Sequence, residues 1–266
     1  MAGAATLNEK TIGSLESVLR AYANGTIFGE TYGEGEIRVI WLHGWGRTGA
    51  DFAKSAELLA QRGVASLALD LPGFGASPPP ATAGGARTYA TLLVSALKEV
   101  GSTPVVLVGH SFGGRIASVL ASTYPELVSG VLFTGAPLVK RSSGGRSPLA
   151  YRIIRKARRL GLVSESRLEK ARQRYGSVDY RAAQGVMREV LVASVNESYE
   201  VELKNIHQKV IALWGSEDHD VPFDVAYRAL GLIPGENELE LLMDIGHLVP
   251  LAAPTDLARV TEKLLS

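Results

Sequence analysis

The sequence predicts an α/β fold in which a mostly parallel central sheet is flanked by helices. Short apolar runs, with the length of buried strands, alternate along the chain with longer helical patterns. This alternation is typical of a parallel sheet covered on both faces. It is interrupted once, at about 137–205, where every pattern is helical. The 266 residues therefore predict a single large α/β domain that carries a helical insertion.

The predicted elements follow one another with short connections. Six apolar runs are predicted strands: Ile37–Leu42, Ser66–Leu69, Pro104–Val108, Gly130–Thr134, Lys209–Trp214 and Glu238–Leu242. A further strand, Thr26–Thr31, is expected to form an edge hairpin with Ile37–Leu42. Helices are predicted at Asp51–Arg62, Thr88–Val100, Phe112–Thr123, Phe223–Leu230 and Thr255–Leu265.

The insertion divides the chain into three parts. Residues 1–136 and 206–266 are expected to build the core domain, and 137–205 a helical cap. The cap follows the strand at about 130–134 and is expected to sit over the strand ends. Its predicted helices are Pro148–Leu160, Ser164–Tyr175, Tyr180–Glu189 and Val192–Lys204.

The composition excludes several classes of function. The chain has no cysteine, which excludes disulfides, thiolate metal sites and a cysteine nucleophile. Its net charge of +1 does not indicate a nucleic-acid partner. The N-terminal residues lack the regions of a signal peptide, and no run reaches the roughly 18 apolar residues of a membrane span. We therefore expect a cytoplasmic protein without an integral membrane segment, either a monomer or a homodimer.

The most informative motif follows the predicted strand Pro104–Val108. Gly109, Ser111 and Gly113 form a G-x-S-x-G sequence between that strand and the predicted helix Phe112–Thr123. A serine on so tight a turn needs flanking residues without Cβ, because larger residues would clash with the strand and the start of the helix. The turn holds the serine Oγ above the sheet, near the amides of the helix N-terminus. Ser111 is therefore the predicted nucleophile.

His247 is the predicted base, because a serine nucleophile needs a base within hydrogen-bond reach. It comes directly after the last predicted strand, and ligands of open α/β folds bind at the carboxyl edge of the sheet. The other histidines fit this role less well. His43 and His110 lie in turns and are better placed to support backbone. His207 ends the insertion, and His219 follows the candidate acid.

Asp218 is the predicted acid that orients the imidazole. It follows the predicted strand Lys209–Trp214 and completes the chain order Ser, Asp, His that this fold requires. The other common position for the acid, directly after Thr134, offers no carboxylate. Glu217 and Asp220 lie beside Asp218 and remain alternatives.

The oxyanion of an acyl transfer needs N–H donors, and backbone is predicted to supply both. One is the N–H of Phe112, directly after the nucleophile. The other is the N–H of Trp45, whose glycine neighbours let the backbone approach a substrate closely. The other residues expected around the substrate are His43, Gly44, Phe74, His110 and Arg115. Two interpretations of Arg115 stay open, binding of a substrate carboxylate and a structural ion pair.

These motifs together resemble the lidded α/β-hydrolase superfamily over essentially the whole chain. The matching segments, in order, are His43–Gly46, Asp70–Ser77, Gly109–Gly114, Asp218 with Pro222, and Gly246–His247. The resemblance is closest to the serine-nucleophile branch, which includes esterases, lactonases and carbon–carbon bond hydrolases. It implies the α/β-hydrolase fold, a helical lid, and a hydrolase that uses neither cofactor nor metal.

The nucleophile restricts the chemistry. Dehalogenases and epoxide hydrolases of this superfamily place an aspartate where this chain has Ser111. A serine attacks a carbonyl and forms an acyl enzyme, so the leading prediction is a serine hydrolase of a carboxylic ester or related acyl bond. Two alternatives are kept. One is carbon–carbon bond hydrolysis of a vinylogous diketone ring-fission product, and the other is a hydrolase-like ligand receptor with residual activity.

The predicted cap is strongly basic. From Lys140 to Arg188 it holds 14 lysines and arginines against three acids, Glu165, Glu169 and Asp179. One interpretation is a lid helix with its apolar face over the pocket and its charges in water. A second is a positive lid that attracts a small-molecule substrate bearing a carboxylate or another anionic group. A third is binding to anionic lipid or an acidic partner.

Overall fold

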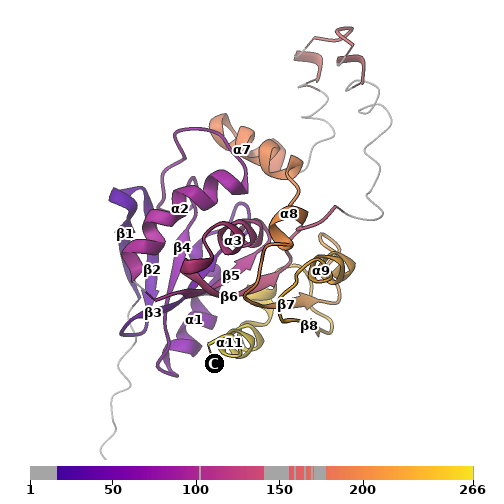
Figure 1. The fold of residues 1–266 in the computed structure, drawn as a ribbon. Helices are drawn as coiled ribbons and strands as arrows, with labels where there is room; N and C mark the ends of the chain where they lie inside the picture. The colour runs from indigo at the N-terminus through magenta and orange to yellow at the C-terminus, as the bar shows by residue number, and fades with distance from the viewer. Residues whose placement is uncertain are drawn as a thin grey trace, which may run out of the picture.

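The computed structural model describes residues 17–101, 103–140, 156–158, 160–164, 166–168, 170 and 178–265. An eight-stranded sheet forms its centre, with helices on both faces (Figure 1). The strands are β1 Val18–Tyr22, β2 Ile27–Tyr32, β3 Ile37–Leu42, β4 Ala65–Asp70, β5 Val105–His110, β6 Val128–Thr134, β7 Lys209–Gly215 and β8 Asn237–Leu242. The predicted strands are therefore present, with ends that differ by a few residues.

The sheet is mostly parallel, as predicted. Its strand order is β1-β2-β4-β3-β5-β6-β7-β8. β2 is antiparallel to both of its neighbours, whereas every adjacent pair from β4–β3 to β7–β8 is parallel. The parallel strands therefore end at one common edge, and the loops that carry the candidate site follow that edge.

The predicted hairpin between β2 and β3 is wrong. β4 lies between these two strands, so β2 pairs with β4 on one side and with β1 on the other. The reason is the burial of β3, whose residues Val39–Leu42 are fully enclosed. Such a strand has parallel neighbours on both edges, here β4 and β5, and β2 is left at the periphery.

The helices form a layer on each face of the sheet. They are α1 Ala53–Ala60, α2 Ala86–Val100, α3 Phe112–Thr123, α6 Val178–Ala182, α7 Gly185–Asn196, α8 Glu200–Leu203, α9 Phe223–Leu230, α10 Val249–Ala252 and α11 Pro254–Glu262, with short 3-10 helices at Ala23–Gly25, Gly49–Phe52 and Pro125–Leu127. One hydrophobic cluster joins α2, α3, α8 and α9 to the sheet, and a second joins α1, α10 and α11 to the opposite face. None of the helices in the described ranges is long and apolar enough to cross a membrane.

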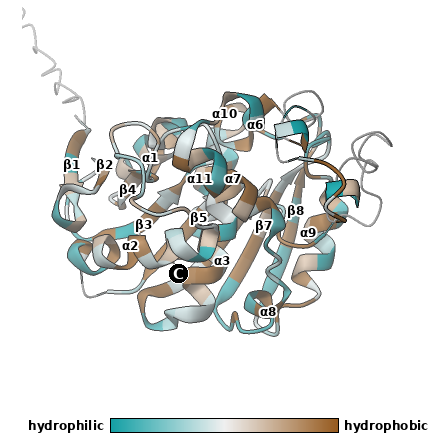
Figure 2. Cartoon of the chain, turned by 90° about the horizontal axis from the view of Figure 1, so that it is seen from above, coloured by the Kyte–Doolittle hydropathy of each residue, from teal (hydrophilic) through white to brown (hydrophobic). Residues whose placement is uncertain are grey.

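The central strands are hydrophobic on both faces because both faces are covered. Every residue of β5 is buried, and so is every residue of β7 after Lys209. Figure 2 shows β7 as hydrophobic along most of its length. Burial on both sides removes the alternation of a half-exposed strand, which explains the continuous apolar runs of the sequence.

Helices α6, α7 and α8 follow β6 and precede β7 along the chain, within the region predicted to form the cap. The predicted helices Tyr180–Glu189 and Val192–Lys204 have the wrong bounds, because the chain breaks at Gln184 and again at Glu197, both extended. Helix α8 packs beside α3 and α9, with Leu203 in the main core cluster. The predicted helices Pro148–Leu160 and Ser164–Tyr175 lie largely outside the described residues.

Candidate active site

Ser111 stands on a sharp turn between β5 and α3. Its backbone has φ 51° and ψ −107°, a conformation that costs an L residue roughly 1–3 kcal/mol. The N–H of Ser111 donates to the carbonyl of Thr134 at 2.9 Å, which ties the turn to the end of β6. The Ser111 side chain makes no capping hydrogen bond to α3. The hydroxyl is therefore presented at the helix start without being used by the backbone.

Two glycines make this turn possible by close approach. A Cβ on Gly113 would lie 2.0 Å from the carbonyl oxygen of Leu42, and a Cβ on Gly109 would lie 2.5 Å from the Cα of Gly114. No real Cβ makes such contacts with backbone atoms. The spacing G-x-S-x-G thus follows from the packing of the turn against β3 and the start of α3.

His247 and Asp218 are hydrogen-bonded to each other. Nδ1 of His247 lies 2.8 Å from Oδ2 of Asp218, and Oδ1 of Asp218 accepts the N–H of Val221 at 2.7 Å. The Asp218 side chain is 1% exposed and that of His247 is 19% exposed. Each oxygen of the buried carboxylate therefore has a hydrogen-bond partner, while the ring keeps one edge toward the pocket.

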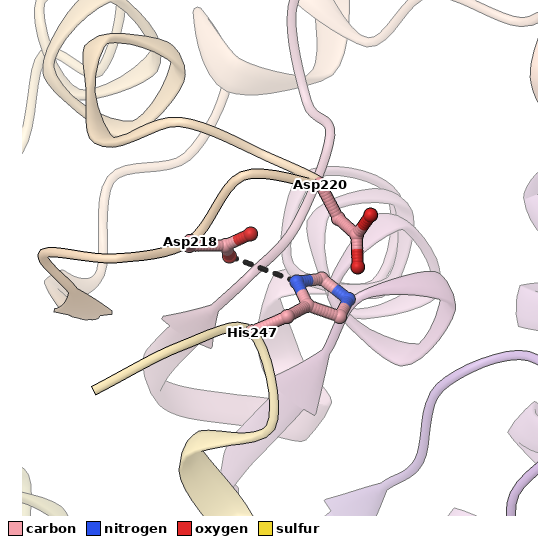
Figure 3. Close-up of side chains that lie close together, drawn as sticks. All are labelled: Asp218, Asp220 and His247. Carbon is pink, nitrogen blue, oxygen red and sulfur yellow. Dashed lines mark hydrogen bonds and ion pairs between the residues drawn. The ribbon is translucent and has the colours of Figure 1, made fainter.

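Figure 3 shows the hydrogen bond between Asp218 and His247, with the carboxylate of Asp220 outside that bond. Asp220 comes from the same loop, and its carboxylate lies next to the imidazole ring on another side from Asp218. Glu217 points to His219 instead, at 3.9 Å, with 60% of its side chain exposed. Asp218, rather than either alternative, makes the hydrogen bond to Nδ1.

Ser111 and His247 line one pocket of about 350 Å³. The lining is completed by residues of three loops, of the end of β5 and of α6, namely Gly44, Trp45, Arg47, His110, Asp179, Asp220, Val221 and Leu248. Of the residues predicted to surround the substrate, Gly44 and His110 lie in this lining. His43, Phe74 and Arg115 do not, and each has another set of contacts.

His43 is buried beside the pocket rather than in it. Its side chain is fully enclosed and both ring nitrogens contact backbone groups, Nδ1 the carbonyl of Gly44 and Nε2 the N–H of Leu71. Burial lowers the pKa of His43 to about 4. Both ring nitrogens already have partners and the ring has no exposed surface, so it cannot contact a substrate. The prediction that His43 contacts the substrate is therefore wrong.

Phe74 belongs to an aromatic cluster under the pocket. Its ring packs edge-on against His43 at 5.4 Å and against Trp45 at 5.0 Å. Trp45 in turn packs on Phe112 at 5.6 Å. These edge-to-face contacts fix the indole of Trp45, so Phe74 acts on the pocket wall through its neighbour.

His110 lies directly behind His247, with ring centroids 4.9 Å apart. Its Nδ1 lies 3.2 Å from the carbonyl of Thr134, the same carbonyl that accepts the N–H of Ser111. Burial, reinforced by the neighbouring His247, lowers the pKa of His110 to about 3. A neutral His110 therefore supports the turn and forms part of the pocket wall.

Arg115 lies on α3 and reaches toward α7. Its Nη1 donates to the carbonyl of Ser194 in α7 at 2.8 Å, and burial lowers its pKa. The acceptor in this hydrogen bond is a backbone carbonyl, while the nearby Tyr199 and Glu197 act on the guanidinium in the opposite sense to burial and raise its pKa. The side chain joins α3, the helix that follows Ser111, to α7.

The candidate oxyanion donors lie beside Ser111. Phe112 is the first residue of α3, so its N–H has no acceptor within the helix. Trp45 lines the pocket, and a Cβ on the preceding Gly44 would come 3.4 Å from the Cβ of Ser111. In the described part of the chain, the N–H of Trp45 donates to no protein acceptor. Both N–H groups are available to a substrate oxygen.

Sequence reasoning missed four residues of the lining. Arg47 and Leu248 adjoin motif residues and could have been found by extending the motifs outward. The guanidinium of Arg47 donates two hydrogen bonds of 2.6 Å to the carboxylate of Asp51, so Arg47 is already paired. Val221 lies between the motif residues Asp218 and Pro222 and could have been found in the same way. Asp179 carried no signal, because its place in the pocket depends on how α6 folds back.

One group of three metal-ligating side chains occurs among the residues that the structure describes. It consists of Asp218, Asp220 and His247. The hydrogen bonds to His247 and Val221 account for both oxygens of Asp218. Nothing else about the group points to an ion, and no metal role is assigned to it.

Comparisons with known proteins agree with this fold. The family described as alpha/beta hydrolase fold matches residues 37–156. A 2-hydroxy-6-oxononadienedioate/2-hydroxy-6-oxononatrienedioate hydrolase of Pseudomonas sp is 25% identical over 84% of this chain and 86% of its own. A pimeloyl-[acyl-carrier protein] methyl ester esterase of Chromobacterium violaceum is 41% identical over 38% of this chain and 37% of its own.

Among solved structures, an esterase from Exiguobacterium antarcticum superposes with a TM-score of 0.72 and 22% identity, covering 94% of this chain and 100% of that one. Fold, motif order and these relatives agree. The chain has the α/β-hydrolase fold, and the comparisons support a hydrolase of the α/β-hydrolase superfamily.

Proposed function

We propose that this protein is a serine hydrolase that cleaves a carboxylic ester or related acyl bond through an acyl enzyme. The observation that carries the proposal is the hydrogen bond between His247 and the buried Asp218, at a pocket that Ser111 also lines. A serine, an imidazole and an orienting carboxylate, in this chain order, are the groups that acyl transfer requires.

In the proposed mechanism, Nε2 of His247 removes the proton of the Ser111 hydroxyl while Oγ attacks the substrate carbonyl carbon. The carbonyl π electrons move to oxygen, and the N–H groups of Trp45 and Phe112 stabilise that oxyanion. When the intermediate collapses, the alkoxide leaves with the proton from His247. Water then attacks the acyl enzyme by the same route, releasing the acid and regenerating Ser111.

We further propose that residues 137–205 form a cap that selects the substrate. Helix α6 supports this assignment, because its Asp179 lines the pocket although it is remote from the core motifs in sequence. A small-molecule substrate that bears an anionic group would be drawn by the basic residues of the cap, whereas Asp179 and Asp220 favour a neutral group beside His247. The proposed substrate therefore carries any carboxylate away from the scissile bond.

The direct test is turnover of a short chromogenic ester by wild type and by Ser111→Ala, His247→Ala and Asp218→Asn. Each substitution is expected to reduce kcat by about three orders of magnitude or more. A fluorophosphonate probe should label Ser111 in wild type, as located by mass spectrometry, and should leave Ser111→Ala unlabelled. Full turnover by Ser111→Ala would overturn the mechanism.

Carbon–carbon bond hydrolysis is the second candidate, favoured by the Pseudomonas relative with its dienedioate and trienedioate substrates. The same residues would serve, because a vinylogous diketone also presents a carbonyl for attack. A substrate panel separates the two. Turnover of ring-fission diketones with none of simple esters selects this candidate, and tight ligand binding without turnover of either class selects a receptor.

A further inference from the structure

His43 connects three segments of the chain beside the candidate active site. Its Nδ1 lies 2.7 Å from the carbonyl oxygen of Gly44, in its own loop after β3. Its Nε2 lies 2.9 Å from the backbone nitrogen of Leu71, in the loop after β4. Its own carbonyl accepts the N–H of Gly113, at the start of α3, at 3.0 Å. The loop after β3, the loop after β4 and the start of α3 therefore meet at this one buried residue.

The two ring contacts determine the tautomer of His43. The N–H of Leu71 is a donor, so Nε2 must present its lone pair, and the carbonyl of Gly44 is an acceptor, so Nδ1 must carry the proton. The ring is then neutral. Its complete burial supports this state, because desolvation lowers the pKa of His43 to about 4.

The contact with Gly44 has a consequence on the other side of the same peptide unit. The carbonyl of Gly44 and the N–H of Trp45 belong to one peptide, and in a planar trans peptide they point in opposite directions. The Gly44 carbonyl is held by His43 and also by the N–H of Arg47 at 3.2 Å. Fixing the carbonyl therefore fixes the direction of the N–H of Trp45.

We propose that His43 is a positioning residue that aims the Trp45 N–H at the oxyanion by holding the Gly44 carbonyl through Nδ1. This inference rests on the proposed function, because it assigns a role within the same acyl transfer. His43 does not line the pocket, and it acts through the peptide that links Gly44 to Trp45.

The loop after β4 keeps the ring of His43 in place. The carboxylate of Asp70 accepts the N–H groups of Gly49 and Ala76, both at 2.8 Å, and so joins this loop to the segment that follows the Trp45 loop. Leu71 follows Asp70 directly and is fully buried. The donor to Nε2 is consequently fixed, and rotation of the imidazole away from Gly44 would leave that donor unpaired in the core.

Three substitutions separate the contacts of the ring. His43→Leu removes both, His43→Gln keeps an acceptor near the Nε2 position, and His43→Asn keeps a donor near the Nδ1 position. Loss of one oxyanion donor lowers kcat by about 10²–10³. Because His43 only aims the donor, we expect His43→Leu and His43→Gln to lower kcat by about 10- to 100-fold with KM changed less than about threefold. His43→Asn should retain more of kcat than either.

A tetrahedral inhibitor gives a readout that a purely structural role would not move. A trifluoromethyl ketone forms an oxyanion adduct with the serine, whereas the matching trifluoromethyl alcohol does not. Ketone affinity should fall in parallel with kcat/KM across the variants, and alcohol affinity should not change. Thr261→Ala is the control, because it removes a buried hydroxyl that bonds the Leu257 carbonyl at 2.7 Å on the opposite face of the sheet. It should lower stability and leave kcat unchanged.

These experiments distinguish failure of the positioning role of His43 from failure of the proposed function. Wild-type kcat per active site in His43→Leu, in an enzyme that Ser111→Ala inactivates, overturns the positioning role alone. Retained turnover in Ser111→Ala overturns both. If every His43 variant fails to fold, imidazole ¹⁵N NMR of the wild-type protein decides. A neutral ring protonated at Nδ1 at pH 7 supports the inference, and a ring protonated at Nε2 overturns it.

Discussion

Asp218 holds His247 by a hydrogen bond of 2.8 Å between Oδ2 and Nδ1, while its other oxygen accepts the N–H of Val221. The carboxylate is 1% exposed, so water does not compete for either bond. This arrangement assigns the proton of the neutral imidazole to Nδ1 and leaves Nε2 with a lone pair on the pocket side. The orientation of the candidate base is thus set by a group that the substrate never reaches.

The first prediction concerns that carboxylate. Asp218→Asn should lower kcat by about 10³–10⁴, because an amide stabilises the wrong tautomer of His247 while the geometry is kept. The matched control is Glu217→Gln, which makes the same change in the same loop at a side chain that is 60% exposed. It should keep kcat within about twofold. A larger loss in Glu217→Gln or in Asp220→Asn than in Asp218→Asn would reassign the acid.

The second prediction concerns the turn that carries Ser111. A Cβ on Gly113 would meet the Leu42 carbonyl oxygen at 2.0 Å, and both groups are backbone of the core. Gly113→Ala should therefore displace α3 from β3 and lower the free energy of unfolding by about 3 kcal/mol or more. Gly231→Ala is the control, since its φ is −63° and its Cβ would have contacts of 3.6 and 3.7 Å. Urea unfolding of both variants gives the comparison, and equal stability would contradict the packing argument.

The third prediction is a loss of stability in acid caused by two buried histidines. Burial lowers the pKa of His43 to about 4 and that of His110 to about 3, from 6.5. Below about pH 6.5 the unfolded chain binds protons at these rings and the folded chain does not, so the unfolding free energy falls as the pH falls. Each ring contributes about 1.4 kcal/mol per pH unit, His43 down to about pH 4 and His110 to about pH 3.

Urea unfolding at pH 7, 6, 5 and 4 tests this, with wild type compared against His43→Leu. Carboxylates contribute the same slope to both proteins, so the difference between the two curves isolates the imidazole. The variant should be less stable than wild type at pH 7, and the gap should narrow toward pH 4. Parallel curves would mean that His43 is not held neutral in the folded state.

The sequence predicted the parallel sheet and the motif positions because both depend on local rules. Ser111 was found from a turn whose glycines are required by contacts of about 2 Å with backbone, and His247 from its place after a strand. The bounds of α3 and α9 were predicted to the residue because each helix follows a tight, motif-bearing turn. Non-local pairing was predicted less well. The place of β4 between β2 and β3 depends on which strand edges are already occupied, which no local pattern records.

The pocket wall illustrates the same limit. His43 belongs to a motif and Arg115 directly follows one, yet their side chains turn away from the pocket toward Leu71 and Ser194. Asp179 is remote from every motif, yet it lines the pocket. Proximity in sequence fixes where a backbone segment lies, whereas the direction of a side chain depends on the tertiary partners that satisfy it.

The fourth prediction follows from Arg115. Its guanidinium donates to the Ser194 carbonyl of α7, so it should serve stability rather than substrate binding. Arg115→Met should lower the unfolding free energy by about 1–3 kcal/mol, because a buried carbonyl loses its donor. The ratio of kcat/KM for a carboxylate-bearing ester to that for a neutral ester of the same length should stay within about twofold of wild type. A selective loss with the carboxylate-bearing ester would show that Arg115 binds substrate.

The fifth prediction concerns the charge of the pocket. Asp179 and Asp220 both line it, and the pKa of Asp179 is raised by burial and by Asp220, so the two carboxylates repel each other and would also repel an anionic substrate there. Asp179→Asn should therefore raise kcat/KM for a carboxylate-bearing ester by about two- to fivefold relative to a neutral ester of the same length. The gain should shrink in 0.5 M salt, since an exposed charge is screened over about 4 Å at that ionic strength.

Glu189→Gln is the matched control for this change. Glu189 lies on α7, is exposed and does not line the pocket. Glu189→Gln therefore removes one negative charge from the same insertion without altering the site. If both variants raise the ratio equally, the effect belongs to the net charge of the insertion and attracts anions at long range. If Asp179→Asn alone raises it, the repulsion acts within the pocket. In that case the basic residues of the proposed cap attract an anionic substrate, while the carboxylates in the pocket repel it. The distance between the substrate's carboxylate and its scissile bond then decides which of these two electrostatic effects acts on that carboxylate.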